Sequence, residues 1–173
     1  MMTEFEAVAL ALQYPGPGSL DRLRAAWEAL PGGPVRRHLL KFFGEIEQLS
    51  TAGWEELHTR TLDLAPIFAP YIGFVIWGEN YQRGEFMAGV KVAQDEVGID
   101  RNGELPDHLE PVLRYLSATD ERYPGLVEVF PRAVSKVSKT LKEAEADNPY
   151  RHVLAAAAEA AERLEAPVGG GTA

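Results

Sequence analysis

The hexapeptide Glu104–Leu109 holds the side chains best suited to chemistry in this sequence. It reads Glu-Leu-Pro-Asp-His-Leu and brings two carboxylates and an imidazole close together. Pro106 suits the first position of a helix, where a helix dipole stabilises nearby acidic groups. The same carboxylates could receive cationic groups of a ligand, and Asp107 makes the charge of His108 responsive to pH. From the residues alone, a capped helix with a solvent-facing histidine is favoured over a binding site.

A second segment of unusual composition runs from Trp77 to Met87. Its residues Glu79 and Arg83 stand at i and i+4, the spacing of a favourable ion pair on one helix face. Gly84 in a helix interior costs about 1 kcal/mol relative to alanine. That cost predicts either close helix packing or a peptide that approaches the backbone. A packing glycine beside a surface ion pair is the simpler interpretation.

The residues required by several other chemistries are missing. The chain has no cysteine, which excludes thiolate nucleophiles, disulfides and cysteine-bearing metal sites. The four histidines are His38, His58, His108 and His152, and no two are four residues apart. Neither a nucleophile-elbow motif nor a phosphate-binding glycine loop occurs. We therefore expect no catalytic residue, no metal site and no bound cofactor.

The charge of the chain is acidic and unevenly distributed. Asp and Glu number 26 against 17 Lys and Arg, so the net charge is −9. This balance argues against nucleic-acid binding, since proteins that track phosphates are basic. The stretch Glu79–Glu110 contains eight acidic and three basic residues. Conversely, a basic stripe follows one predicted helix at Arg132, Lys136, Lys139 and Lys142. Such a stripe is usually a solvated face, although it could also meet an acidic partner.

Helical periodicity dominates the pattern of apolar residues. Spacings of three and four predict about eight helices, separated by proline and glycine breaks. The expected helices cover residues 3–12, 19–30, 35–49, 54–61, 79–97, 106–116, 131–145 and 149–165. Phe74–Ile76 and Leu126–Phe130 are the best strand candidates, but both lie in helix-compatible windows. The sequence therefore predicts an all-α fold, an irregular multi-helix bundle rather than an up-and-down one.

The length of 173 residues favours one domain, which we place at residues 1–166 with a flexible tail at 167–173. Glu4 and Glu6 stand where a secretory signal would need basic residues. The longest apolar stretch, Ile67–Trp77, is too short to span a membrane, which takes about 20 residues. We therefore expect a soluble, cytoplasmic protein without membrane insertion.

Several short motifs, taken in order, resemble the molybdenum-cofactor assembly chaperones of nitrate reductase, also called its delta subunits. The resemblance extends from about residue 5 to 155. It is carried by Thr59–Leu64, Gly78–Glu79, Arg83–Gly84, Met87 and Glu104–Leu109. These chaperones belong to the wider family of redox-enzyme maturation chaperones.

The resemblance implies an all-helical protein without catalytic activity. Its partner would be the immature catalytic (alpha) subunit of nitrate reductase, bound through an N-terminal leader or leader-like segment until the molybdenum cofactor is inserted and the enzyme docks at the membrane. Proteins that deliver the molybdenum cofactor are a further class of partner. The resemblance assigns the peptide groove to Glu104, Pro106, Asp107 and His108, and the second signature to Glu79, Arg83 and Gly84.

A leader peptide is basic at its start and apolar after it, so an apolar groove with acidic rims would suit it. Aromatic and methionine side chains make adaptable apolar surfaces. The candidate groove residues of this kind are Trp77, Tyr81, Met87 and Tyr115. Two other functions stay open: a permanent structural subunit of a redox complex, and a small hydrolase that uses Asp107 and His108.

Overall fold

A computed structural model describes residues 1–64 and 66–165 of the chain, and it confirms the all-α prediction. Within these ranges there is no β-strand, only an isolated antiparallel bridge between Tyr71 and His108. The helices are α1 (Glu4–Leu12), α2 (Ser19–Ala29), α3 (Pro34–Ile46), α4 (Thr51–His58), α5 (Ile72–Trp77), α6 (Tyr81–Glu96), α7 (Leu109–Ala118), α8 (Pro124–Ala144) and α9 (Tyr150–Glu165). A π-helical turn, Thr59–Asp63, continues α4. The predicted tail at 167–173 lies outside the described residues.

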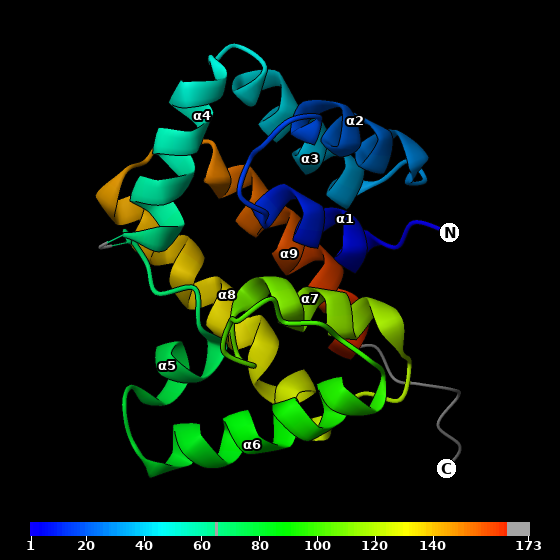
Figure 1. The fold of residues 1–173 in the computed structure, drawn as a ribbon, viewed down its shortest axis with the longest axis vertical. Helices are drawn as coiled ribbons and strands as arrows, with labels where there is room; N and C mark the ends of the chain where they lie inside the picture. Colours follow the sequence, from blue (N-terminus) through cyan, green and yellow to red (C-terminus); the bar gives the residue numbers. More distant parts are fainter. Residues whose placement is uncertain (65, 166–173) are drawn as a thin grey trace.

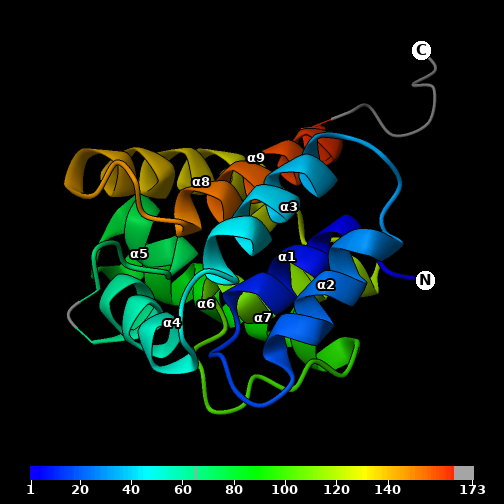
Figure 2. The same cartoon turned by 90° about the horizontal axis from the view of Figure 1, so that it is seen from above.

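Helix α9 is the centre of the packing. It contacts α3, α8 and α1, and it lies between α3 and α8 in both views of the fold (Figures 1 and 2). Four alanines of α9 are almost completely buried, namely Ala156, Ala157, Ala160 and Ala161. Small side chains let neighbouring backbones approach closely, which allows several helices to share one core. On the other side of α1 lies α7, the helix that follows the Glu104–Leu109 segment.

Local signals predicted some helix ends and missed others. Thr3 caps α1, because its hydroxyl accepts a hydrogen bond from the Glu6 amide at 3.0 Å. Ser50, rather than Thr51, caps α4 through the amide of Gly53 at 3.0 Å. Helix α8 begins at Pro124, earlier than the predicted 131, and Pro131 lies inside it. Both strand candidates are helical: Phe74–Ile76 lies in α5, and Leu126–Phe130 lies in the first turns of α8.

The helices α5 and α6 form a separate arm of the fold. Helix α5 packs on α6 and on α8, and Figure 1 shows both helices at the end of the molecule remote from α2. A segment that we call the strap, residues 66–71, connects the region after α4 to α5. Within the described ranges, no helix combines the length and the apolar character needed to cross a membrane.

Candidate functional site

A buried ion pair joins the two sequence segments that stood out. Arg83, in the first turn of α6, donates from Nε to Asp107 Oδ2 at 3.0 Å and from Nη2 to Oδ1 at 3.3 Å. The backbone amide of Gly73 donates to the same Oδ2 at 3.0 Å. The side chain of Asp107 is 0% exposed and that of Arg83 only 13%. A bidentate pair with a further backbone donor satisfies a carboxylate that burial would otherwise destabilise.

This geometry corrects two expectations. Asp107 was expected at an exposed peptide groove, yet it is buried and fully occupied by Arg83 and Gly73. The expected Glu79–Arg83 pair does not form. Helix α6 begins at Tyr81, with Asn80 as its cap, so Glu79 lies outside the helix and is exposed. Arg83 instead turns towards the buried carboxylate, where the lower dielectric makes the attraction stronger.

Backbone hydrogen bonds fasten the Glu104–Leu109 segment to the strap and to the first residue of α5. The amide of Leu109 donates to the carbonyl of Pro70 at 2.8 Å, and the amide of Ile72 donates to the carbonyl of Asp107 at 2.8 Å. Gln94, buried in α6, donates from Nε2 to the carbonyl of Pro106 at 2.9 Å. The segment is therefore held by the strap and α5 through backbone bonds, and by α6 through the carbonyl of Pro106.

His108 is the cap of α7, which begins at Leu109 rather than at the predicted Pro106. Its Nδ1 accepts a hydrogen bond from the amide of Glu110 at 3.1 Å. Its Nε2 lies 3.7 Å from Oε2 of Glu104, and the ring of Tyr71 stands edge-on at 5.2 Å. Burial lowers the pKa of His108, although the nearby carboxylates act in the opposite direction. The expected solvent-facing histidine is thus mostly buried, with one edge near Glu104.

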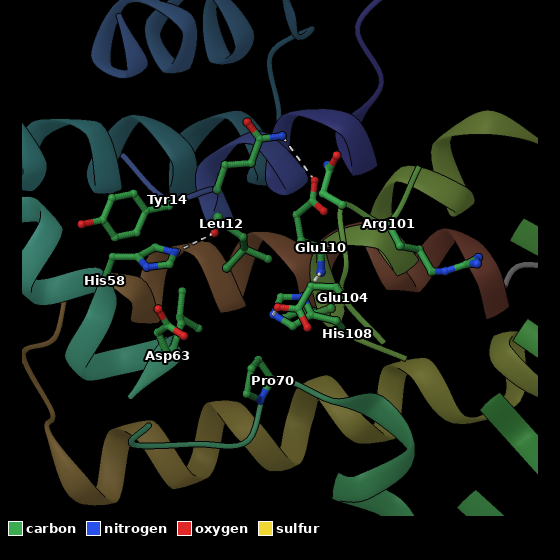
Figure 3. A pocket seen from close by; sticks show the side chains of 13 residues that line it. Leu12, Tyr14, His58, Asp63, Pro70, Arg101, Glu104, His108 and Glu110 are labelled. Atoms are coloured by element: carbon green, nitrogen blue, oxygen red, sulfur yellow. Dashed lines mark hydrogen bonds and ion pairs between the residues drawn. The ribbon is translucent and has the colours of Figure 1, made fainter. Parts of the chain in front are cut away.

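Glu104 and His108 border a cavity of about 470 Å³, which we call the acidic pocket (Figure 3). That volume falls within the range typical of small ligand sites. The pocket lies between the end of α1, the α4 region and the segment before α7. Its lining consists of Leu12, Gln13, Tyr14, His58, Leu62, Asp63, Pro70, Arg101, Asn102, Glu104, His108, Leu109 and Glu110.

The charged groups of the acidic pocket differ in how far they are neutralised. Glu110 is paired with Arg114 at 2.6 Å, and Arg101 is paired with Asp95 at 3.0 Å. Glu104 accepts a hydrogen bond from the Tyr71 hydroxyl at 3.1 Å, and its side chain is 43% exposed. No ion pair of Asp63 occurs among the described residues. The pocket can therefore offer the carboxylates of Glu104 and Asp63 to a cation.

Two aromatic residues of the pocket were missed by the sequence analysis. His58 is buried, its Nε2 donates to the carbonyl of Leu12 at 3.0 Å, and Tyr14 stands edge-on to its ring at 5.2 Å. Burial lowers the pKa of His58. In Figure 3 both rings lie above Asp63, on the side of the pocket opposite Glu104. The position of His58 directly before the Thr59–Leu64 motif was the one available signal, and Tyr14 carried none.

In comparisons with known proteins, no family model matches this chain, and no curated protein matches it either. Among the described residues, no group of three or more histidine, aspartate or glutamate side chains is placed to hold a metal ion.

The remaining predicted groove residues do not line the acidic pocket. Tyr115 belongs to the core: it is 2% exposed, and its hydroxyl accepts a hydrogen bond from the Tyr123 amide at 2.8 Å. Trp77 packs against the ring of Phe86, Met87 is half-buried in α6, and Tyr81 is exposed at the start of that helix. These four residues of α5, α6 and α7 are therefore separate from the pocket that Glu104 borders.

Gly84 does not mark a close helix contact. A Cβ atom built on Gly84 would meet nothing within 4 Å, so the expected tight packing is wrong. Within α5 and α6, the close approaches occur at two other glycines, Gly73 and Gly89. A Cβ on Gly73 would lie 2.7 Å from Asp107 Oδ2, and a Cβ on Gly89 would collide with the ring of Tyr123.

Proposed function

We propose that this protein is an assembly chaperone of nitrate reductase. It binds the N-terminal leader of the immature catalytic subunit and holds that subunit for insertion of the molybdenum cofactor. One observation carries the proposal beyond the sequence resemblance. Arg83 belongs to one signature and Asp107 to the other, and these two residues pair with each other in a buried position. Glu104 and His108 of the same segment remain at the acidic pocket. The Arg83–Gly84 and Glu104–Leu109 motifs therefore act together, because the ion pair between them holds Glu104 and His108 in place.

The proposal divides the motif residues into two roles. Asp107 and Pro106 position the segment, because one binds Arg83 and Gly73 and the other binds Gln94 through its carbonyl. Glu104 and His108 face the ligand. Asp63, on the opposite side, adds a second carboxylate that has no cationic partner among the described residues.

A basic, partly apolar peptide matches this pocket. The carboxylates of Glu104 and Asp63 attract a lysine or arginine, and Tyr14 offers an aromatic ring to the same cation. Leu12, Leu62 and Leu109 supply apolar contact for the following side chains. Charge then selects the peptide, while apolar contact supplies most of the affinity.

The geometry argues against the hydrolase alternative that uses Asp107 and His108. Both oxygens of Asp107 are engaged by Arg83, so the carboxylate does not orient His108. An acid–base pair needs such an orienting hydrogen bond. The permanent-subunit alternative predicts that the chain co-purifies with mature nitrate reductase, whereas a chaperone leaves once the cofactor is inserted.

The decisive experiment is calorimetric titration with a synthetic peptide of the N-terminus of the cognate catalytic subunit. Glu104→Gln should weaken binding about tenfold, which corresponds to about 1.4 kcal/mol. Glu28→Gln, on the exposed surface of α2, removes the same charge away from the pocket and serves as the control. Affinity should also fall as salt rises, since exposed charges are screened within about 10 Å at 0.1 M salt. Equal affinity of the two variants would remove the acidic pocket from recognition.

A further inference from the structure

A second groove lies on the other flank of the strap. Its lining combines apolar side chains from the strap and α5, among them Ile67, Phe68 and Phe74, with the polar α8 residues Lys136, Lys139, Thr140 and Glu143. The hollow measures about 490 Å³, and we call it the basic groove. It is distinct from the acidic pocket, because Pro70 borders that pocket while Ile67 and Phe68 border this groove.

The cations of the basic groove are largely uncompensated. Lys136 makes no ion pair among the described residues. Lys139 reaches Glu143 only at 3.9 Å, with side chains that are 75% and 67% exposed. An ion pair of that length and exposure contributes little stabilisation. By contrast, arginines elsewhere form tighter pairs, such as Arg60 with Glu145 at 2.6 Å. The two ammonium groups therefore remain available to an external anion.

The local sign of charge is opposite to that of the molecule. Helix α8 carries four basic and two acidic residues, while the whole chain has a net charge of −9. An extended polyanion such as a nucleic acid would be repelled by the surrounding acidic surface. A short acidic segment that enters the groove would meet mainly the lysines.

The apolar component requires a partner that is more than an anion. Phe74 is 38% exposed beside the lysines, and Ile67 is half-buried. The α8 residues of the groove run from Lys136 to Glu143, which spans about 10 Å or two helical turns. A partner helix with an apolar face and an acidic edge fits these features by helix-in-groove recognition.

We propose that the basic groove is a second docking site, for an acidic amphipathic helix of a partner protein. The apolar face of that helix covers Phe74 and Ile67, and its Asp or Glu side chains pair with Lys136 and Lys139. The site does not depend on the leader function of the acidic pocket. Occupation of both sites would let one chain hold a basic segment and an acidic segment at the same time.

The test uses a designed probe. It is an acidic amphipathic peptide of about 18 residues, roughly five helical turns, with leucines on one face and glutamates along its edges. Fluorescence anisotropy with the full chain measures its binding. We expect Lys136→Glu combined with Lys139→Glu to weaken binding at least tenfold. Arg37→Glu combined with Lys41→Glu, an equal change of exposed charge on α3, should leave binding unchanged. Circular dichroism checks that both variants are folded.

Further arms separate the other occupants. A scrambled peptide of the same composition should bind at least tenfold more weakly, and Glu104→Gln should bind the probe like the wild type. The proposal is overturned if the probe does not bind at about 1 mM, or if both charge-reversed variants bind it equally. Lysine-dependent binding of anionic phosphatidylglycerol vesicles without peptide binding would assign the groove to a membrane. Self-association that is lost in the Lys136/Lys139 variant would assign it to a second copy of the chain.

Discussion

Replacement of Asp107 by asparagine should destabilise the protein strongly, because it leaves the guanidinium of Arg83 in a mostly buried position without a counter-charge. Asp107 is 0% exposed and Arg83 is 13% exposed. Breaking a buried ion pair by removing one partner costs about 3–5 kcal/mol. We expect Asp107→Asn to cost about 3 kcal/mol, at the lower end of this range. Arg83 keeps some exposure to solvent, and the amide oxygen of asparagine can still accept hydrogen bonds.

Urea unfolding followed by far-UV circular dichroism measures this change. For a chain of this size, about 3 kcal/mol corresponds to a fall in Tm of roughly 6–12 °C. Asp147→Asn, at an exposed carboxylate before α9, is the matched control and should change the free energy of unfolding by less than about 0.5 kcal/mol. Removing both charges, by Arg83→Met with Asp107→Asn, should cost less than the sum of the two single changes by at least about 1 kcal/mol.

The same variants distinguish a positioning residue from a ligand-binding residue. If Asp107 were exposed at a groove, Asp107→Asn would cost no more than the Asp147 control and would mainly weaken peptide binding. A destabilisation below about 1 kcal/mol, or additive effects of the Arg83 and Asp107 changes, would therefore refute the buried-pair argument. Glu104→Gln should show the opposite behaviour, with nearly unchanged stability and weaker leader binding.

Three other outcomes are expected. Gly84→Ala should stabilise the protein by about 0.5–1 kcal/mol in chemical denaturation, because a Cβ there meets open space. Gly73→Ala should destabilise it by about 1–3 kcal/mol, because its Cβ would collide with Asp107. Equal effects of the two substitutions on the free energy of unfolding would contradict this packing. In histidine NMR titrations, His38, His58 and His108 should all show a pKa below 6.5, since burial disfavours the charged ring. The unfolded chain then binds protons more readily than the native one. The stability present above about pH 6.5 should therefore decline as the pH falls from there towards the lowered pKa values of these histidines. A rise in stability on acidification over this range would contradict the lowered pKa values. Treatment with EDTA should change neither Tm nor leader binding, and a fall in Tm that zinc or iron reverses would reveal a metal site.

Much of the helical architecture could be predicted from local patterns. Spacings of three and four between apolar residues identify helices because one face of each must be buried. Thr3 was recognisable as a cap, since its hydroxyl needs only the amide of Glu6, three residues later. Short windows were ambiguous: Leu126–Phe130 satisfies both strand and helix patterns, and only packing inside α8 decides between them.

The pairing of charges could not be predicted in the same way. Arg83 has Glu79 at a favourable helical spacing, yet it pairs with Asp107, which is 24 residues further along the chain. Because α6 begins at Tyr81, Glu79 does not lie on the helix face that carries Arg83. The burial of Asp107 strengthens its attraction to Arg83. Both facts depend on how α5, α6 and the segment before α7 meet.

The sequence by itself determined the all-α class, the acidic balance and the segments rich in functional side chains. Tertiary structure alone decided which of those side chains face a cavity. The acidic pocket joins Tyr14, His58 and Glu104, which lie far apart in the chain and share no local spacing. The glycines of α6 show the same difference. Gly84 and Gly89 both lie inside one predicted helix, and of these two only Gly89 lies against the Tyr123 ring. Helix formation depends on neighbours within about one turn, whereas a pocket depends on which helices pack together.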